Sequence, residues 1–270
     1  MDGMAGQADD GEGDADPLFT LWGSDGSSHQ ALAFFLDVDG TLVEIAPTPD
    51  SVVVSPDLPD ILERLSEAVD GALVVVSGRS IAQIDDLLKP AKLPAAGLHG
   101  LESRETALGK IMTPPVPPQM DQAVQAMKAF VEAHPGTLFE DKTHSLAIHY
   151  RRAPETEAAA RDLAEAVMAE LGAGYHILAG KMVFEVKPDG ADKGQAVTRF
   201  MALPAFAGRR PVFIGDDVTD EDGFAAVNAL GGTSIRVGPA DRPTEAQTHV
   251  PSVSDLHRLL AAQADRGGDS

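Results

Sequence analysis

Two aspartates near the start of the chain follow a short apolar run. They stand in Asp37-Val-Asp39-Gly-Thr41, directly after Phe34-Phe-Leu36. If the apolar run is a strand of an open parallel sheet, both carboxylates project from the edge where such sheets bind ligands. Two acids at this spacing, followed by a glycine that permits a tight turn, can share a divalent cation while one carboxylate oxygen attacks an electrophile. The alternative is an ordinary turn in which the aspartates bind only the local backbone.

A hydroxyl and a guanidinium follow a second apolar run. Ser77-Gly78-Arg79 comes after Val74-Val-Val76, at the place where a helix is expected to begin. Backbone N–H groups at a helix start attract anions, so these three residues predict a phosphate-binding loop. The alternative for Ser77 is the structural role of a helix N-cap.

Two later segments carry further charge. Asp192-Lys193-Gly194 begins another expected helix, where a lysine opposes the helix dipole unless an anion lies nearby. Gly215-Asp216-Asp217, with Asp220 soon after, follows the apolar run Val212-Phe-Ile214. Carboxylates at the ends of two strands form an oxygen-rich site suited to Mg²⁺.

Short apolar runs alternate with helical patterns, which favours an α/β fold with a parallel sheet buried on both faces. Strands are expected at 33–36, 73–76, 95–98, 211–214 and 233–237, and helices from 57 or 58, at 80–88, 192–201 and 221–228. Ser55 or Asp57 is the expected cap of the first helix.

A proline-rich segment interrupts this pattern. Residues 113–118 contain four prolines, which exclude a helix interior or a central strand. A helix from Met120, a hairpin around Leu138 and Ala147, a helix through Val167 and two strands at 175–178 and 182–186 follow. The sequence therefore predicts a second α/β domain inserted into the first. The expected parts are an acidic disordered tail at 1–30, a core at 31–111 and 188–262, the insert at 112–187 and a flexible tail at 263–270. The prolines and residues 187–192 are the expected hinges.

Composition restricts the function classes. Hydrophobic residues make up 43% and charged residues 23% of the 270 residues, which indicates a globular protein. A net charge of −21 disfavours nucleic acid as a partner. The absence of cysteine excludes disulfides, cysteine-bound zinc and thiol catalysis. No apolar run approaches the ~20 residues of a membrane helix, and the N-terminus has no signal-peptide pattern. We expect a cytoplasmic monomer that binds a small molecule and no membrane.

The four charged segments, in their order along the chain, resemble the four motifs of the haloacid dehalogenase superfamily of phosphatases. The resemblance covers residues from about 31 to 250 and implies a Rossmann-like core with a cap domain. It also implies that Asp37 is the nucleophile and Asp39 the general acid and base. The implied phosphate ligands are Thr41, Ser77, Gly78, Arg79 and Lys193. Mg²⁺ would be held by the Asp37 carboxylate, the Asp39 main-chain carbonyl and Asp216, with Asp217 and Asp220 as second choices for metal or supporting roles.

The insert lies between the second and third motifs, which in this superfamily corresponds to a C2-type cap (C2B). Its charged residues resemble those of trehalose-6-phosphate phosphatases, as do Gly97-Leu-His99-Gly100 and the segment from Gly215 to Glu221. That resemblance implies Mg²⁺-dependent hydrolysis of trehalose 6-phosphate through an aspartyl-phosphate. The implied sugar ligands are Glu140, Lys142, Arg151, Lys181 and Glu185.

Several alternatives remain at this stage. The cap charges could form only a solvated face. Lys187 and Val38 stand where that family often has Arg and Tyr. A related cap could accept a sucrose or mannosyl phosphate, and a third possibility is a non-catalytic sensor of a phosphorylated sugar. His99 is the histidine expected nearest the site, with a structural hydrogen bond as its role.

Overall fold

The larger of two sheets has seven strands in the order β11-β10-β9-β1-β2-β3-β4. The computed structural model describes residues 31–46, 51–190 and 192–267, with the side chains of 266 and 267 outside the description. The strands are β1 (Leu32–Leu36), β2 (Leu73–Val76), β3 (Ala95–Gly97), β4 (Glu102–Arg104), β9 (Arg210–Gly215), β10 (Thr233–Val237) and β11 (Thr248–Val250). All neighbours run parallel except β3 and β4.

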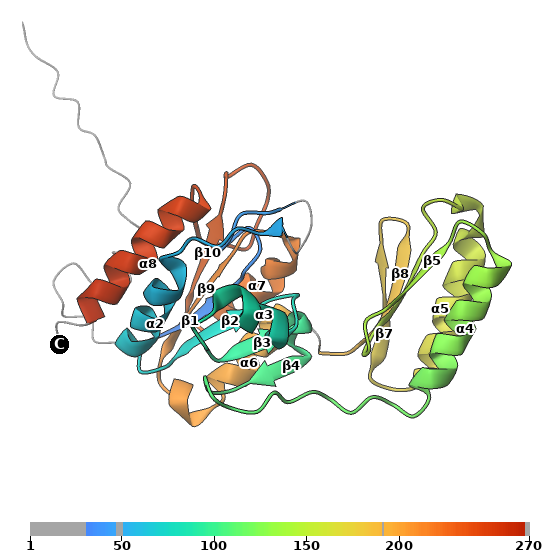
Figure 1. Ribbon diagram of the computed structural model, residues 1–270, viewed down its shortest axis with the longest axis horizontal. Helices are drawn as coiled ribbons and strands as arrows, with labels where there is room; N and C mark the ends of the chain where they lie inside the picture. The colour runs from blue at the N-terminus through green and yellow to red at the C-terminus, as the bar shows by residue number, and fades with distance from the viewer. Residues whose placement is uncertain (1–30, 47–50, 191, 268–270) are drawn as a thin grey trace, which may run out of the picture.

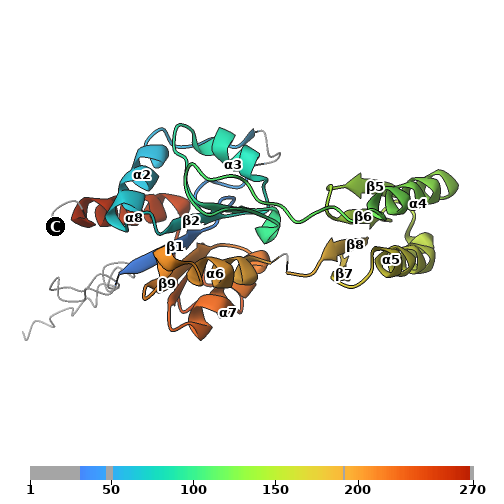
Figure 2. The same cartoon turned by 90° about the horizontal axis from the view of Figure 1, so that it is seen from below.

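Helices cover both faces of this sheet (Figure 2). They are α2 (Leu58–Ala68), α3 (Ile81–Leu88), α6 (Lys193–Met201), α7 (Glu221–Ala229) and α8 (Val253–Gly267). Helices α2, α3 and α8 lie on one side, and α6 and α7 on the other. Every residue of β1 is buried as a result. This explains why its sequence is a continuous apolar run and does not alternate.

Strand β1 occupies the centre of the sheet, between β2 and β9. Its Phe35 is paired with Val74 on one side and with Phe213 on the other. The carboxyl ends of these three strands therefore meet at one edge, and the segments that carry the sequence motifs follow them directly.

The smaller sheet is antiparallel, in the order β5-β6-β8-β7. Its strands are β5 (Leu138–Asp141), β6 (Leu146–His149), β7 (Tyr175–Gly180) and β8 (Val183–Pro188). Helices α4 (Met120–Ala133) and α5 (Glu157–Leu171) pack on one face and form a separate apolar core with the sheet. The other face is turned toward the first sheet (Figure 1). We call the part with the larger sheet the core domain and the part with the smaller sheet the cap domain.

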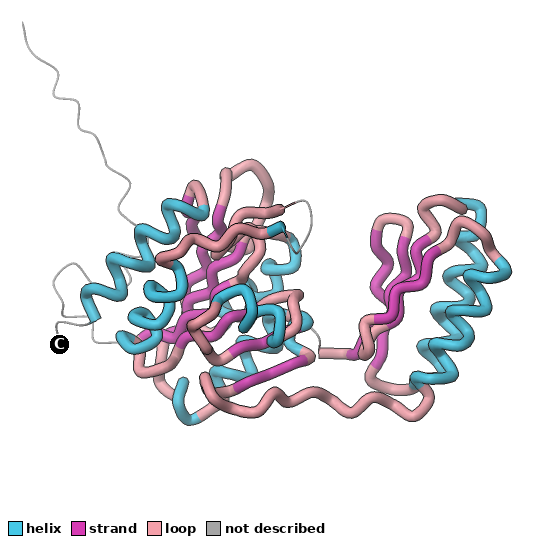
Figure 3. Tube along the Cα trace, viewed as in Figure 1, coloured by secondary structure: helices cyan, strands magenta, loops and turns pink. Residues whose placement is uncertain are grey.

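The chain crosses between the two domains twice, before α4 and after β8 (Figure 3). On β8, Phe184 and Val186 are buried against the helices, while Glu185 and Lys187 alternate with them on the free face. The two-residue period of a strand thus separates the cap's apolar residues from its charged ones. Within the described residues, no helix is both long and apolar enough to span a bilayer.

Most of the expected elements are confirmed. Strands β2 and β10 have the predicted bounds, the hairpin of β5 and β6 is present, and Ser80 caps α3 through a reciprocal pair with Gln83. Asp57 precedes α2 as expected, but its side chain makes no capping bond.

Other expectations are wrong. Edge strands β4 and β11 were not predicted, because three-residue strands carry too little periodicity. Lys187 and Pro188, expected to be part of a hinge, belong to β8 and pair with His176 and Tyr175 of β7. The flexible tail expected at 263–270 is wrong for 263–267, where α8 continues and buries Gln263 and Ala264. The tail predicted at 1–30 lies outside the described residues.

The packing of α8 against α2 generates a stability prediction. Leu260 of α8 is fully buried, whereas Leu108 is 90% exposed. We expect Leu260→Ala to lower the free energy of unfolding by about 2–5 kcal/mol, because the lost methyl groups leave a cavity. Leu108→Ala, the matched control, should change it by less than about 0.5 kcal/mol. Urea unfolding followed by far-UV circular dichroism measures both, and equal stability of the two variants would contradict the packed α8.

Candidate active site

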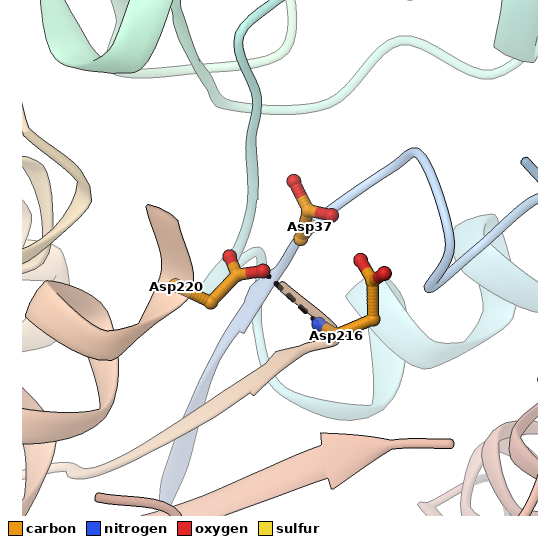
Figure 4. A group of neighbouring side chains, drawn as sticks. All are labelled: Asp37, Asp216 and Asp220. Carbon is orange, nitrogen blue, oxygen red and sulfur yellow. Dashed lines mark hydrogen bonds between the residues drawn. The ribbon is translucent and has the colours of Figure 1, made fainter. Parts of the chain in front are cut away.

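Three aspartates meet at the carboxyl edge of the large sheet. Asp37 follows β1 and Asp216 follows β9, and the N–H of Asp37 donates to the Ile214 carbonyl at 2.9 Å. Asp220 ends the short helical turn η5 (Val218–Asp220). Each of these acids offers a carboxylate oxygen, and the three oxygens lie within 4.8 Å of one another (Figure 4). We call Asp37, Asp216 and Asp220 the acid cluster.

Asp220 holds the other members of the site in place. Its Oδ2 accepts hydrogen bonds from the backbone N–H groups of Asp216 and Asp217, both at 3.0 Å. Its Oδ1 accepts from Lys193 Nζ at 2.6 Å. Both oxygens are therefore engaged, and the side chain is fully buried. The Asp217 carboxylate is engaged as well, because it accepts from the N–H and hydroxyl of Thr219.

Lys193 occupies the first position of α6 and is 3% exposed. Its ammonium donates to Asp37 Oδ1 and to Asp220 Oδ1, each at 2.6 Å. Burial opposes the charged form, but attraction to Asp37 and Asp220 outweighs it, and the pKa of Lys193 is raised. The lysine at a helix start, anomalous in the sequence, is therefore explained by two buried anions.

The acid cluster carries more negative charge than Lys193 can balance. Burial raises the pKa of Asp37 well above its ordinary value, with repulsion from Asp220 adding to the effect and Lys193 opposing it. Burial, together with repulsion from Asp220 and Asp217, raises the pKa of Asp216 to about 6. An additional cation would relieve this repulsion. Because both Asp220 oxygens are engaged, Asp37 and Asp216 are the side chains that fit a hard divalent cation.

Gly40 lets the two strand ends approach each other. Its φ is +84°, and a Cβ there would lie 2.2 Å from Asp216 Oδ2. Any side chain would therefore collide with the acid cluster and would also strain the backbone. Thr41, fully buried next to it, directs its hydroxyl to Asp216 Oδ1 at 3.4 Å.

The loop Ser77–Arg79, which we call the phosphate loop, follows β2. Ser77 is buried and Ser80 caps α3, so the N-cap alternative for Ser77 is excluded. The Ser77 hydroxyl accepts a hydrogen bond from the Arg79 N–H at 3.2 Å. The backbone N–H groups at the start of α3 were expected to bind the phosphate. The first of them, the Ile81 N–H, instead donates to Glu102 Oε2 at 2.6 Å.

Arg79 lies against Asp39. The guanidinium Nε donates to Asp39 Oδ2 at 2.7 Å and Nη2 donates to Oδ1 at 2.6 Å. A two-point pair of this kind fixes both oxygens of the carboxylate in one plane. The sequence placed Arg79 among phosphate ligands, whereas its observed contact is with the second aspartate of the first motif.

The five predicted cap residues form two groups. Lys142 donates to Glu185 at 3.3 Å and lies 4.0 Å from Glu140, at the end of the strands near Pro188. Ser145 also donates to Glu185, and Glu140 pairs with His149 at 3.0 Å. Burial raises the pKa of Glu185, but the hydrogen bond from Ser145 and the positive charge of Lys142 outweigh it and lower that pKa. Arg151 and Lys181 are exposed at the opposite end, where the Tyr150 N–H donates to the Met182 carbonyl at 3.0 Å.

His99 lies in a backbone segment with unusual geometry, the short helical turn η2 (Leu98–Gly100). Leu98 and His99 have φ values of +50° and +55°, a region that residues with a Cβ seldom adopt. The structural hydrogen bond expected of His99 is made by its backbone, whose N–H donates to the Ser77 carbonyl at 2.9 Å, and its ring makes none among the described residues. Sequence reasoning also missed the pairing of Arg79 with Asp39, which no spacing signals.

Comparisons with known proteins agree on one family. The model of the trehalose-phosphatase family matches residues 35–254. A probable trehalose-phosphate phosphatase of Sinorhizobium fredii is 43% identical over 232 residues, covering 86% of this chain and 87% of that protein. Trehalose-6-phosphate phosphatase of Escherichia coli is 42% identical over 230 residues, covering 84% and 85%. Among solved structures, trehalose-6-phosphate phosphatase of Aspergillus fumigatus matches with a TM-score of 0.71 at 26% identity, covering 88% of this chain and 93% of that one.

The raised pKa of Asp216 predicts pH-dependent metal binding. Below pH 6 this carboxyl holds a proton that a cation must displace, so affinity falls as the pH falls and is nearly constant above about pH 7. We expect the association constant for Mg²⁺ or Mn²⁺ to fall about tenfold from pH 7 to pH 5. Calorimetric titration measures it, with Asp216→Asn as the non-binding variant and Asp86→Asn, on the surface of α3, as control. Equal affinity at pH 5 and pH 7 would refute the assignment.

Proposed function

The chain belongs to the trehalose-phosphatase family, and we propose that it hydrolyses trehalose 6-phosphate to trehalose and phosphate. The observation that carries the proposal is the buried contact of Lys193 with Asp37, beside Asp216. It provides an attacking carboxylate, a fixed positive charge and a cation site at one edge of the sheet. The relatives of 42–43% identity over most of the chain support the substrate.

We propose Mg²⁺ as the cofactor, held by the carboxylates of Asp37 and Asp216 and, as the family resemblance implies, by the main-chain carbonyl of Asp39. When bound, it neutralises charge on the phosphoryl group and on the acid cluster. Two carboxylates at the carboxyl ends of β1 and β9 support this choice of metal, because Mg²⁺ prefers oxygen ligands.

Asp37 is the proposed nucleophile. A carboxylate oxygen of Asp37 attacks phosphorus, the bond from phosphorus to the sugar oxygen breaks, and Asp39 donates a proton to that oxygen, so that trehalose leaves and an aspartyl-phosphate remains. Asp39 then takes a proton from water, whose oxygen attacks phosphorus, and phosphate leaves with Asp37 regenerated. Each proton that Asp39 gives in the first half is regained in the second.

Lys193 orients Asp37 and reduces its repulsion of the substrate dianion. This is required because a carboxylate and a phosphate monoester repel each other, and because the net charge of −21 adds to that repulsion. The proposed phosphate ligands Thr41, Ser77 and Gly78 lie on the two loops next to the acid cluster. Arg79 positions Asp39 in the conformation described, and its role as a phosphate ligand remains a prediction. Asp217 and Asp220 support the site and are not proposed as ligands of the metal.

The cap domain, which we assign to the C2 type, is the proposed sugar-binding element. The free face of its sheet is turned toward the core domain (Figure 1) and carries Glu140, Lys142 and Glu185. Carboxylates accept hydrogen bonds from sugar hydroxyls, and ammonium groups donate to them, in both cases with the added strength of a charge. Lys181 lies in the turn between β7 and β8, beyond Glu185 along the strand, so the proposed sugar ligands are spread along the length of the sheet. A monomer in the cytoplasm remains our prediction from the sequence.

A panel of esters tests the substrate. We expect phosphate release from trehalose 6-phosphate to exceed release from glucose 6-phosphate and sucrose 6-phosphate by about a hundredfold in kcat/KM, because only trehalose presents both glucose rings to the charged cap face. EDTA should abolish the activity and added Mg²⁺ should restore it. Metal-dependent hydrolysis of another ester at an equal or higher rate would retain the chemistry and overturn the substrate.

Replacement of the nucleophile tests the mechanism. Asp37→Asn should reduce kcat by about three orders of magnitude or more, because the amide cannot form the aspartyl-phosphate. Asp86→Asn is the matched control for the same substitution at an exposed site. Phosphate release under saturating substrate measures both, and turnover of Asp37→Asn within tenfold of the parent would remove Asp37 from the role.

A further inference from the structure

His99 lies where the phosphate loop, the start of α6 and the cap meet. Its backbone N–H donates to the Ser77 carbonyl, and the Leu98 N–H donates to the Arg79 carbonyl, both at 2.9 Å. On the other side, a Cβ on Gly100 would lie 3.2 Å from the Asp192 carbonyl oxygen, next to Lys193. The segment is thus fixed between the two loops that carry the proposed phosphate ligands.

The imidazole ring is held at close range over the phosphate loop. A Cβ on Gly78 would lie 2.8 Å from His99 Nε2, so a side chain at position 78 would collide with the ring. Leu98 and His99, which carry positive φ values, both lie in this segment. Conformations of this kind persist only where surrounding contacts enforce them, and they are concentrated at binding sites.

The ring has hydrogen-bonding capacity that no neighbour uses. Within the described part of the chain, the half-buried ring makes no hydrogen bond and its nitrogens are not sealed from solvent, so both are open to a ligand. Burial, Lys193 and Lys187 lower the pKa of His99 to about 4, against the opposing influence of Glu185 and Asp217. At neutral pH the ring is uncharged and offers one N–H donor and one acceptor.

His99 lies within electrostatic reach of both the proposed phosphate site and the charged cap face. Lys193 lies at the phosphate end, whereas Glu185 and Lys187 lie on the charged cap face. A sugar phosphate that joins these two ends passes His99 with the sugar ring that carries the phosphate. A neutral imidazole donates one hydrogen bond and accepts one, as a sugar hydroxyl does, so the two groups suit each other. The phosphate dianion, which only accepts, is better suited to the ammonium of Lys193.

We propose that His99 hydrogen-bonds a hydroxyl of the phosphorylated glucose ring and thereby selects the sugar next to the phosphate. This inference rests on the proposed function. It assigns the core domain a part in sugar recognition, which the sequence placed in the cap.

The test compares substrates with and without a sugar. We expect His99→Ala to lower the ratio of kcat/KM for trehalose 6-phosphate to kcat/KM for p-nitrophenyl phosphate about tenfold, the effect of one hydrogen bond. His99→Asn, which keeps a donor and an acceptor, should recover the ratio to within about threefold. His249→Ala, an exposed histidine on the far edge strand β11, should leave the ratio unchanged. If His99→Ala lowers both activities equally, the ring only supports the phosphate loop and the proposal is wrong.

A second measurement uses the unmodified enzyme, so it does not depend on folding of a variant. Among trehalose 6-phosphate analogues that lack one hydroxyl of the phosphorylated ring, one should lose about tenfold in kcat/KM, and His99→Ala should add little to that loss. If no analogue is affected, the proposal fails while the proposed function stands. If the parent enzyme does not hydrolyse trehalose 6-phosphate at all, the proposed function fails, and this inference fails with it.

Discussion

A single buried ammonium group organises the site. Lys193 is almost fully shielded from water, and its contacts with Asp37 and Asp220 join the end of β1, the start of α6 and the turn η5. A buried charge without partners is strongly destabilising, so these three segments are constrained to meet. Asp220 extends the constraint by holding the N–H groups of Asp216 and Asp217. The charges are therefore in place before any substrate arrives, as electrostatic preorganisation requires.

Much of this arrangement could be predicted because burial on both faces marks parallel strands clearly. Phe34 to Leu36 and Val212 to Ile214 are unbroken apolar runs, and the polar residues after them must lie at the same sheet edge. The role of Asp220 could not be predicted in the same way. Which of the neighbouring acids faces a cation and which holds the turn depends on backbone hydrogen bonds within η5.

Contacts between residues far apart in the chain could not be predicted from the sequence either. Arg79 and Asp39 are 40 residues apart and meet only because β1 and β2 are neighbours. Glu102, which engages the start of α3, belongs to an edge strand of three residues with no periodic signal. The end of α8 was missed because a segment rich in small and polar residues near a terminus resembles a tail, whereas its burial comes from packing against α2.

The cap is attached to the core by two crossings of the chain, and this has a kinetic consequence. A face joined to the core by two chain segments does not need to find the site by diffusion, since its effective concentration there is of the order of millimolar or higher for short tethers. The two attachments also restrict rotation, so the same charged face of the sheet is presented at each approach. If Glu140, Lys142 and Glu185 bind the sugar as proposed, weak individual contacts are then sufficient to retain it during turnover without holding the product tightly afterwards. The double tether thus favours rapid release as well as selective capture.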